Sequence, residues 1–143
     1  MDVQLATTDD ELIAASSVLL QLRPHYDQAS LLAQIKKQQD CAGFRVATVI
    51  HDDEVVCVAG FVITEKLAWG KALYVDDLVT DENKRSLGAG HTMIAWLKAY
   101  AHEQGCCELR LDSGVQRLDA HRFYDREGFA RASLHFPLAI CKP

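Results

Sequence analysis

Residues 73–100 read LYVDDLVTDENKRSLGAGHTMIAWLKAY, and the rest of the chain is organised around them. An apolar run with strand character leads into a charged loop, then into a glycine-containing turn, and then directly into an amphipathic helix. Backbone N–H groups at such a turn and at the start of the helix point at one spot, where the helix dipole adds roughly half a positive charge. The stretch therefore predicts a cradle for a phosphate or pyrophosphate.

The spelling of the turn excludes two common nucleotide loops. The loop of nucleoside triphosphatases requires a Lys followed by Ser or Thr, and no such pair follows these glycines. The dinucleotide fingerprint lies tight against its strand, whereas charged loop residues intervene here. What remains is the pattern Arg-x-x-Gly-x-Gly, carried by Arg85, Gly88 and Gly90, whose glycines leave room for a ligand close to the main chain.

Length and composition predict one ordinary globular domain spanning residues 1–143. Hydrophobic residues make up 49% of the chain and charged residues 24%, as in typical globular proteins. The formal net charge is −5 and the sequence has no basic stripe, so a nucleic-acid partner is not expected. An acidic protein of this kind suits a cationic substrate.

The five cysteines predict neither a metal site nor a disulfide framework. No CxxC pair occurs, and the adjacent Cys106 and Cys107 would point to opposite faces of a strand. Buried thiols in a reducing compartment are therefore expected. The N-terminus lacks the basic region of a signal peptide, and the longest apolar run, Val55–Ile63, is too short to span a bilayer. We expect a cytoplasmic protein with no metal and no membrane partner.

Local patterns predict a mixed α/β chain. Thr8 and Glu11 form a capping box that begins a first helix, which Pro24 interrupts. The strand, helix, strand order from residue 73 onward indicates parallel pairing of the fourth and fifth strands through a crossover helix. The predicted strands are Val3–Ala6, Phe44–His51, Val55–Thr64, Leu73–Thr80, Cys106–Ser113 and Phe129–Phe136 with Leu138–Ile140. The other predicted helices are Gln28–Gln39, Leu87–Gln104 and Arg117–Arg126.

A second motif lies downstream of the glycine turn. Residues 120–129 read AHRFYDREGF, so two signatures follow one another with a helix and a strand between them. Residues 73–136 thereby resemble the core of the GCN5-related N-acetyltransferase (GNAT) family. The resemblance implies the acyl-CoA N-acyltransferase fold, with a central mixed sheet of six to seven strands, about four helices, and splayed fourth and fifth strands. It also implies direct transfer of the acetyl group of acetyl-CoA, in a ternary complex, to a primary amine of a small molecule or a protein.

The resemblance also indicates where acetyl-CoA binds. Family members hold its pyrophosphate on the glycine turn and pair its pantetheine arm with exposed backbone of the splayed fourth strand. Asp76 and Asp77 break simple alternation in that strand, which predicts a bulge, although a solvated strand edge is the alternative. The implied cofactor-binding residues are Leu78, Val79, Thr80, Arg85, Ser86, Leu87, Gly88, Ala89, Gly90, His91 and Arg117.

Acetyl transfer to an amine requires a proton acceptor, because a free alkylammonium has a pKa of about 10. Asp112, at the end of the fifth strand, and Asp77, in the fourth, are the two candidate bases, and the sequence leaves the choice open. If Asp112 is not the base, its alternative role is structural, as a residue that orders the loop or caps a helix. By resemblance, Tyr124 protonates the departing thiolate, which a phenol suits because it is protonated at neutral pH.

The acceptor amine is not encoded by any motif. The connector between the first two helices forms a wall of the acceptor pocket in this family, so His25 and Tyr26 are candidate substrate contacts or else ordinary connector residues. Arg117 stands where many members have asparagine, and with Arg122 it would bind phosphate or an acidic acceptor group, which leaves substrate polarity open.

Two other functions compete with acetyl transfer, namely a non-catalytic CoA-binding regulatory domain and a peptide- or nucleic-acid-binding module. Sheet edges near the end of the chain also allow a homodimer.

Overall fold

The computed structural model describes residues 1–142, which divide into two compact units, Met1–Leu111 and the part from Asp112 onward. The first unit contains a sheet, three α-helices and one short 3₁₀ turn. Its strands are β1 (Asp2–Leu5), β2 (Arg45–His51), β3 (Glu54–Lys66), β4 (Gly70–Thr80) and β5 (Glu108–Leu111). Its helices are α1 (Asp9–Leu22), α2 (Gln28–Ala42), the 3₁₀ turn η1 (Arg85–Leu87) and α3 (Ala89–Glu103). The second unit contains α4 (Leu118–Arg126).

The sheet is mixed and follows the chain order β1-β2-β3-β4-β5. The first four strands pair antiparallel, whereas β4 and β5 are parallel. This confirms the predicted parallel pair. The crossover through α3 returns the chain to the end of the sheet at which β4 begins, so β5 runs in the same direction as β4.

The helix starts follow local capping chemistry. Thr8 caps α1, its hydroxyl accepting from the Glu11 N–H while the Glu11 carboxylate accepts from the Thr8 N–H, so the predicted capping box is confirmed. These backbone bonds also hold the pKa of Glu11 below its usual value. Asp27 and Ser30 make the equivalent box at the start of α2.

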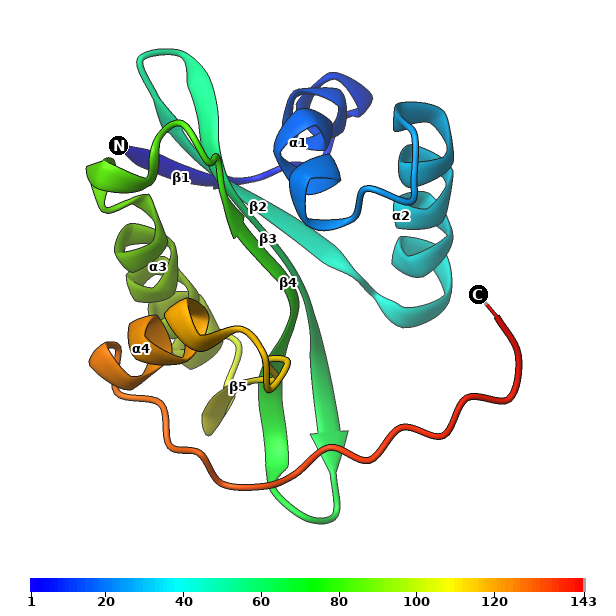
Figure 1. The fold of residues 1–143 in the computed structure, drawn as a ribbon, viewed down its shortest axis with the longest axis vertical. Coiled ribbons are helices and arrows are strands. Elements are labelled where there is room, and N and C mark those ends of the chain that lie inside the picture. The colour runs from blue at the N-terminus through cyan, green and yellow to red at the C-terminus, as the bar shows by residue number, and fades with distance from the viewer. Residues whose placement is uncertain (143) are drawn as a thin grey trace. The chain divides into compact units, whose positions relative to one another are not determined.

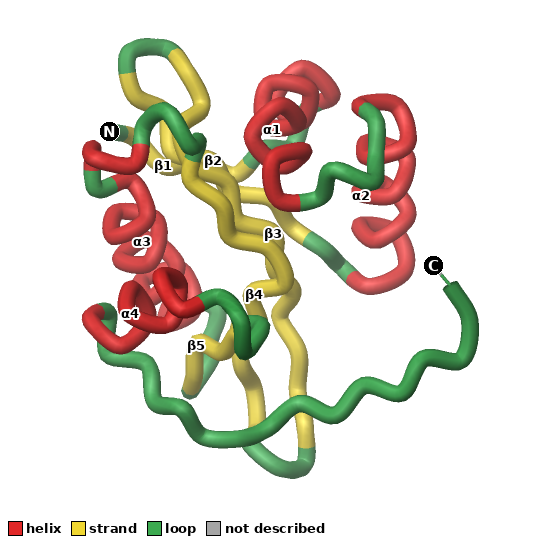
Figure 2. Tube along the Cα trace, viewed as in Figure 1, coloured by secondary structure: helices red, strands yellow, loops and turns green. Residues whose placement is uncertain are grey.

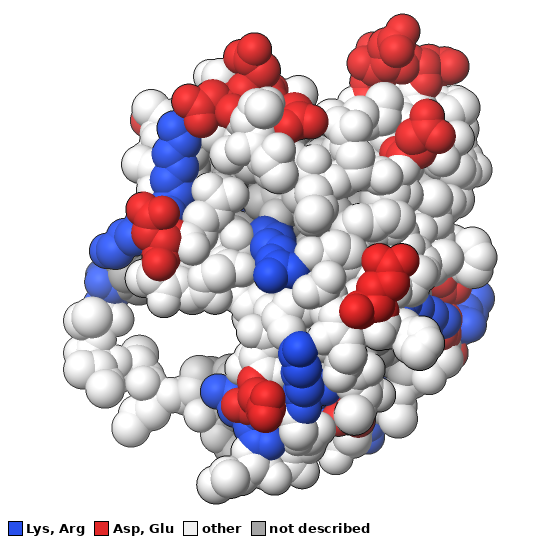
Figure 3. Space-filling view, turned by 180° about the vertical axis from the view of Figure 1, so that it is seen from behind, with Lys and Arg blue, Asp and Glu red and all other residues white. Residues whose placement is uncertain are grey.

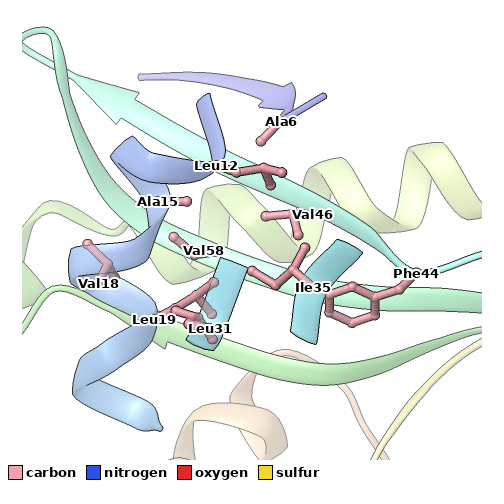
Figure 4. Close-up of a cluster of buried hydrophobic side chains, with 10 residues drawn as sticks. All are labelled: Ala6, Leu12, Ala15, Val18, Leu19, Leu31, Ile35, Phe44, Val46 and Val58. Atoms are coloured by element: carbon pink, nitrogen blue, oxygen red, sulfur yellow. The ribbon is translucent and has the colours of Figure 1, made fainter. Parts of the chain in front are cut away.

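The helices cover both faces of the sheet. Figure 1 shows α1 and α2 on one side and α3 on the other. Figure 4 shows the core beneath α1 and α2, where Val46 and Val58 of the sheet meet Leu12 of α1 and Ile35 of α2. On the α3 face, Phe61 packs edge-on against Tyr100, with ring centroids 5.6 Å apart. Burial on both faces explains the nearly continuous apolar character of β3.

The fourth strand contains a bulge where its alternation breaks. Gly60 pairs with Asp77 while the next residue, Phe61, pairs with Val75, so Asp76 is the extra residue of a bulge in β4. The predicted bulge is confirmed. Val75 and Asp77 therefore face opposite sides of the sheet, although two residues apart in a regular strand they would share one.

The pairing of the fourth and fifth strands ends just before the bulge. Their register runs from Ala72 beside Glu108 to Val75 beside Leu111, which is the last residue of β5. Residues 77–80 continue to pair with β3 on their other edge. Within residues 1–142 these residues of β4 pair with no strand on the β5 side, and the predicted splay stays a prediction.

The predicted sheet of six to seven strands is wrong, because the sheet has five. Residues 129–139, predicted as closing strands, form neither helix nor strand, and the chain after α4 is drawn as loop in Figure 2. Apolar residues do alternate along this segment, but the side chains of Leu134, Phe136, Leu138 and Ile140 are all highly exposed. Alternation alone does not make a strand, because a strand also needs a hydrogen-bonding partner.

The long helix begins later than expected. Arg85–Leu87 form η1, and Gly88, with a φ of 75°, separates that turn from α3. Within residues 1–142, every helix falls short of the length and apolar content that a bilayer crossing requires.

Candidate active site

A cavity of about 230 Å³ lies between α1, α2 and the bulged part of β4. It brings together three of the predicted site residues: His25 and Tyr26 from the connector, and Asp77 from the sheet. The remaining lining comes from the two helices and the residue before β2. These residues are Leu19, Arg23, Leu31, Gln34, Ile35, Gln38 and Phe44.

Asp77 is held in place by an arginine from the end of α1. The Arg23 Nε donates to Asp77 Oδ1 at 2.8 Å, and its Nη2 donates to the carbonyl of Asp76 at 3.1 Å. The Asp77 side chain is only 16% exposed. Arg23 therefore ties the carboxylate and the bulge carbonyl to α1, which fixes the direction of the carboxylate at the cavity wall.

Gly60 provides the space for this arrangement. A Cβ at Gly60 would overlap the Phe44 ring and lie 2.9 Å from Asp77 Oδ2. Here the glycine is required by a close approach of two side chains, both of which line the cavity.

The glycine turn has the geometry of an anion cradle. Gly88 caps α3 in the left-handed conformation, and because it is a glycine it has no side chain that could bond to the first turn of the helix. The first bond back into the cap runs from the Thr92 N–H to the Gly88 carbonyl at 3.1 Å. The amides of the first turn, including those of Ala89 and Gly90, thus have no acceptor within the helix and can bind an anion.

The open edge of β4 lies next in the chain to the cavity residue Asp77. Leu78, Val79 and Thr80 are half-buried and pair with Ala59, Val58 and Cys57 of β3 on one edge only. A second extended chain can pair with such an edge through backbone hydrogen bonds. The two features share one strand: a carboxylate directed into the cavity and a free backbone edge directly after it.

The second unit carries the other candidate catalytic residues, Tyr124 and Asp112. Tyr124 is half-buried in α4, and its ring packs edge-on against Phe123 and Phe129 at 5.4 Å and 5.6 Å between centroids. Asp112 is exposed and lies 3.5 Å from Nδ1 of His135. The structure describes this unit by itself, so the roles of both residues stay predictions.

The two arginines of uncertain role also belong to this unit. Arg117 is exposed at the residue before α4, and Arg122 pairs with Asp119 one turn away. Arg131 makes two hydrogen bonds to the Asp125 carboxylate, and this bidentate pair holds the pKa of Asp125 below its usual value.

Sequence reasoning missed the partner of Asp77 and the polar wall of the cavity. Arg23 lies 54 residues from Asp77, and nothing local links them. Gln34 and Gln38 are four residues apart on α2, and both line the cavity, with Gln34 Nε2 donating to Gln38 Oε1 at 3.0 Å. Their spacing was the available signal, since residues i and i+4 share a helix face.

Charged side chains are dispersed over the face drawn in Figure 3, where Lys and Arg lie among acidic and uncharged residues. Among residues 1–142, no group of three or more His, Cys, Asp and Glu side chains has the arrangement of a metal site.

Comparison with known proteins agrees with this geometry. The sequence profile described as "Acetyltransferase (GNAT) family" matches residues 9–129. The uncharacterised N-acetyltransferase YhdJ of Bacillus subtilis (strain 168) is 27% identical over 131 residues, which cover 91% of this chain and 92% of YhdJ. Glucosamine 6-phosphate N-acetyltransferase 1 of Dictyostelium discoideum is 25% identical over 112 residues, 77% of this chain and 69% of that protein. The solved structure of the aminoglycoside N-acetyltransferase AAC(6')-Iy in complex with CoA has a TM-score of 0.85 at 15% identity, covering 98% of this chain and 95% of that one.

Proposed function

The chain belongs to the acetyltransferase (GNAT) family, and from that premise we propose that it transfers the acetyl group of acetyl-CoA to a primary amine by direct attack in a ternary complex. One observation carries the proposal. The bulge in β4 directs Asp77 into a cavity, and the residues that immediately follow it have a free backbone edge. An acceptor site and a binding edge for an extended co-substrate thereby meet on one strand.

The residues of the first unit fit acetyl-CoA. The first-turn amides of α3 and the η1 turn suit a pyrophosphate, because they present N–H donors and the positive end of a helix dipole. The free edge at Leu78–Thr80 suits the amides of the pantetheine arm. When bound, acetyl-CoA supplies an activated acyl group and a good leaving thiolate.

Asp77 is our candidate for the proton acceptor. Its carboxylate accepts a proton from the substrate ammonium, directly or through one water, so that the nitrogen lone pair becomes available. The nitrogen then forms a bond to the thioester carbonyl carbon, the bond from that carbon to sulfur breaks, and the positively charged nitrogen loses its second proton to water as the amide forms. Backbone N–H groups near Leu78 and Val79 stabilise the negative charge that develops on the carbonyl oxygen.

Tyr124 is our candidate for the group that protonates the leaving thiolate, on the strength of the second motif. A phenol donates this proton at neutral pH because it remains protonated there. Asp112 is the competing base. Asp77 is favoured because it lines the cavity with His25 and Tyr26, whereas Asp112 is exposed beside His135.

The test is release of free thiol from acetyl-CoA in the presence of a broad panel of primary amines. We expect turnover with at least one amine, and we expect Tyr124→Phe to lower kcat by about 10²- to 10⁴-fold, the usual contribution of a general acid. Equilibrium binding of CoA is the control, since a phenylalanine at this position leaves the cradle intact.

A non-catalytic CoA-binding domain is the alternative function. It predicts that CoA raises the melting temperature while no amine in the panel releases thiol. Under that alternative, Tyr124→Phe changes no measurable property.

A further inference from the structure

We propose that the cavity selects a small amine with one positive charge and an uncharged tail that carries a hydroxyl or carbonyl group. This inference rests on the proposed function, since it describes the acceptor of the acetyl group. It excludes amines whose tail bears a phosphate, phosphonate or carboxylate. Three features of the cavity carry it: its charge, its polar wall and its size.

The permanent positive charge of the cavity, that of Arg23, is already committed. Arg23 is the one Lys or Arg among the described lining residues, and its Nε lies 2.8 Å from Asp77 Oδ1. Its Nη2 is used by the carbonyl of Asp76. A tail carrying an anion would enter beside the Asp77 carboxylate without an uncommitted guanidinium or ammonium to meet it, and an uncompensated charge in a half-enclosed site is costly.

The same carboxylate suits the cationic end of the substrate. Only Oδ1 of Asp77 is used by Arg23, which leaves Oδ2 available to a second donor. An ammonium that reaches Oδ2 from the cavity gains a charge-assisted hydrogen bond. The single-charge requirement follows, because the cavity offers one carboxylate.

The polar wall is neutral. Gln34 and Gln38 are half-buried, line the cavity, and are joined by one hydrogen bond of 3.0 Å. Whichever way the two amides are turned, one bond between them leaves one carbonyl oxygen and one NH₂ group for another partner. A hydroxyl on the substrate can donate to the remaining glutamine oxygen and accept from the remaining NH₂ group, and a carbonyl can accept from that NH₂ group. An anionic tail could accept from the NH₂ group only.

The size and the apolar surface limit the rest of the tail. The apolar part of the lining is formed by Leu19, Leu31, Ile35 and Phe44. The volume of about 230 Å³ is below the range of about 300–1,000 Å³ that holds drug-sized ligands. A short aliphatic chain or a single ring fits this volume, and a multi-ring aminoglycoside would have to leave most of its rings outside.

The test compares amines that share a carbon chain and differ in the tail group. The probes are 3-amino-1-propanol, propylamine, β-alanine and 3-aminopropyl phosphate, followed by the amino alcohols of four to six carbons. Binding to the CoA-saturated protein is measured by calorimetry, and thiol release from acetyl-CoA is measured separately. We expect the best amino alcohol to bind at least tenfold tighter than 3-aminopropyl phosphate and β-alanine, and severalfold tighter than propylamine.

Two results overturn the inference: equal or tighter binding of the phosphate or carboxylate probe, or no binding of any probe. Because binding is measured without turnover, the outcomes separate. Selective binding of amino alcohols with no thiol release supports the inference and removes the proposed function, whereas turnover restricted to the phosphorylated amine does the reverse.

Variants of the glutamine wall give an independent readout. Gln38→Lys adds a cation to the cavity, and we expect it to reverse the preference between the alcohol and phosphate probes by at least tenfold. Gln38→Leu should remove the preference for 3-amino-1-propanol over propylamine. Gln39→Lys, at the next position and outside the lining, is the matched control and should leave both preferences within twofold of the parent protein. An unchanged preference in both Gln38 variants would place the tail elsewhere.

Discussion

The two halves of β4 differ in pairing and in burial. Residues 70–75 pair with β3, and from Ala72 they also pair with β5, while Leu73 is fully buried. Residues 77–80 pair with β3 alone and are half-buried. The extra residue Asp76 marks the border between them. One strand thus has a first half that stabilises the fold and a second half with groups available for ligands.

This difference indicates how a site can be built without weakening the core. The pairing with β5 stops just before the bulge. The bulge turns Asp77 to the face of the sheet that α1 and α2 cover, where Arg23 compensates its charge. Because the change occurs at one residue, variants on either side of Asp76 should separate effects on stability from effects on activity.

The largest expected effect concerns activity in the second half. Asp77→Asn removes the proposed proton acceptor while keeping the size of the side chain, so we expect kcat/KM to fall by about 10²- to 10⁴-fold. Steady-state thiol release measures it. Asp76→Asn is the matched control, because the Asp76 side chain is exposed, and it should stay within about threefold. A larger loss in Asp112→Asn than in Asp77→Asn would make Asp112 the base.

The next effect concerns stability in the first half. Leu73→Ala should lower the free energy of unfolding by about 2–5 kcal/mol. Leu73 is fully buried, so the truncation removes buried apolar surface and also leaves a cavity. Urea unfolding measures this change. Leu78→Ala, in the half-buried second half, should cost less than half as much. Equal costs would show that the bulge does not divide the strand in this way.

A smaller effect is expected at Gly60, opposite the bulge. Gly60→Ala should cost about 1–3 kcal/mol by overpacking, because its methyl group overlaps the Phe44 ring and approaches Asp77 Oδ2. Calorimetric melting of the single variant and of Gly60→Ala/Phe44→Leu tests the cause. The double variant should recover part of the loss, and purely additive costs would rule out the contact with Phe44.

A last effect, confined to alkaline pH, is the pH dependence contributed by Cys57, which pairs with Thr80 at the end of the second half. Burial raises the pKa of the Cys57 thiol from its ordinary 9.0 to about 11. The buried thiol stays protonated while the unfolded one ionises, so its contribution to stability is fully present below pH 9. It is lost between about pH 9 and 11, at about 1.4 kcal/mol per pH unit.

Urea unfolding at pH 8, 10 and 11 measures this contribution, with Cys57→Ala as the comparison. The free energy of unfolding of the variant should fall less steeply over the same range. Parallel pH profiles would mean that water reaches the Cys57 thiol in the folded protein.

Local sequence chemistry predicted most of the first unit. The capping box at Thr8 and the break in alternation at Asp76 and Asp77 each encode their structure within a few residues. Such signals work because one or two neighbouring side chains decide the backbone conformation. At Gly88 the structure adds a positive φ, which glycine adopts readily because it has no Cβ, while the predicted approach of a ligand to this glycine stays a prediction.

Contacts between distant segments were not predicted. The Arg23 to Asp77 pair and the approach of Phe44 to Gly60 depend on how α1 and β2 lie against the sheet, and no spacing in the sequence reports this. The strands expected after residue 128 failed for a related reason. The pattern of alternating apolar residues describes one strand, but its hydrogen-bonding partner lies elsewhere in the chain or outside it.

The extra residue at Asp76 has a consequence for reading homologous sequences. An alignment that runs through residues 73–80 without a gap assigns each carboxylate to a side of the sheet by counting in twos from Leu73. That count gives the wrong side for every position after Asp76. A relative without the insertion would need its acidic residue one place earlier to reach the same cavity, so positional identity at residue 77 is a poor guide to shared chemistry.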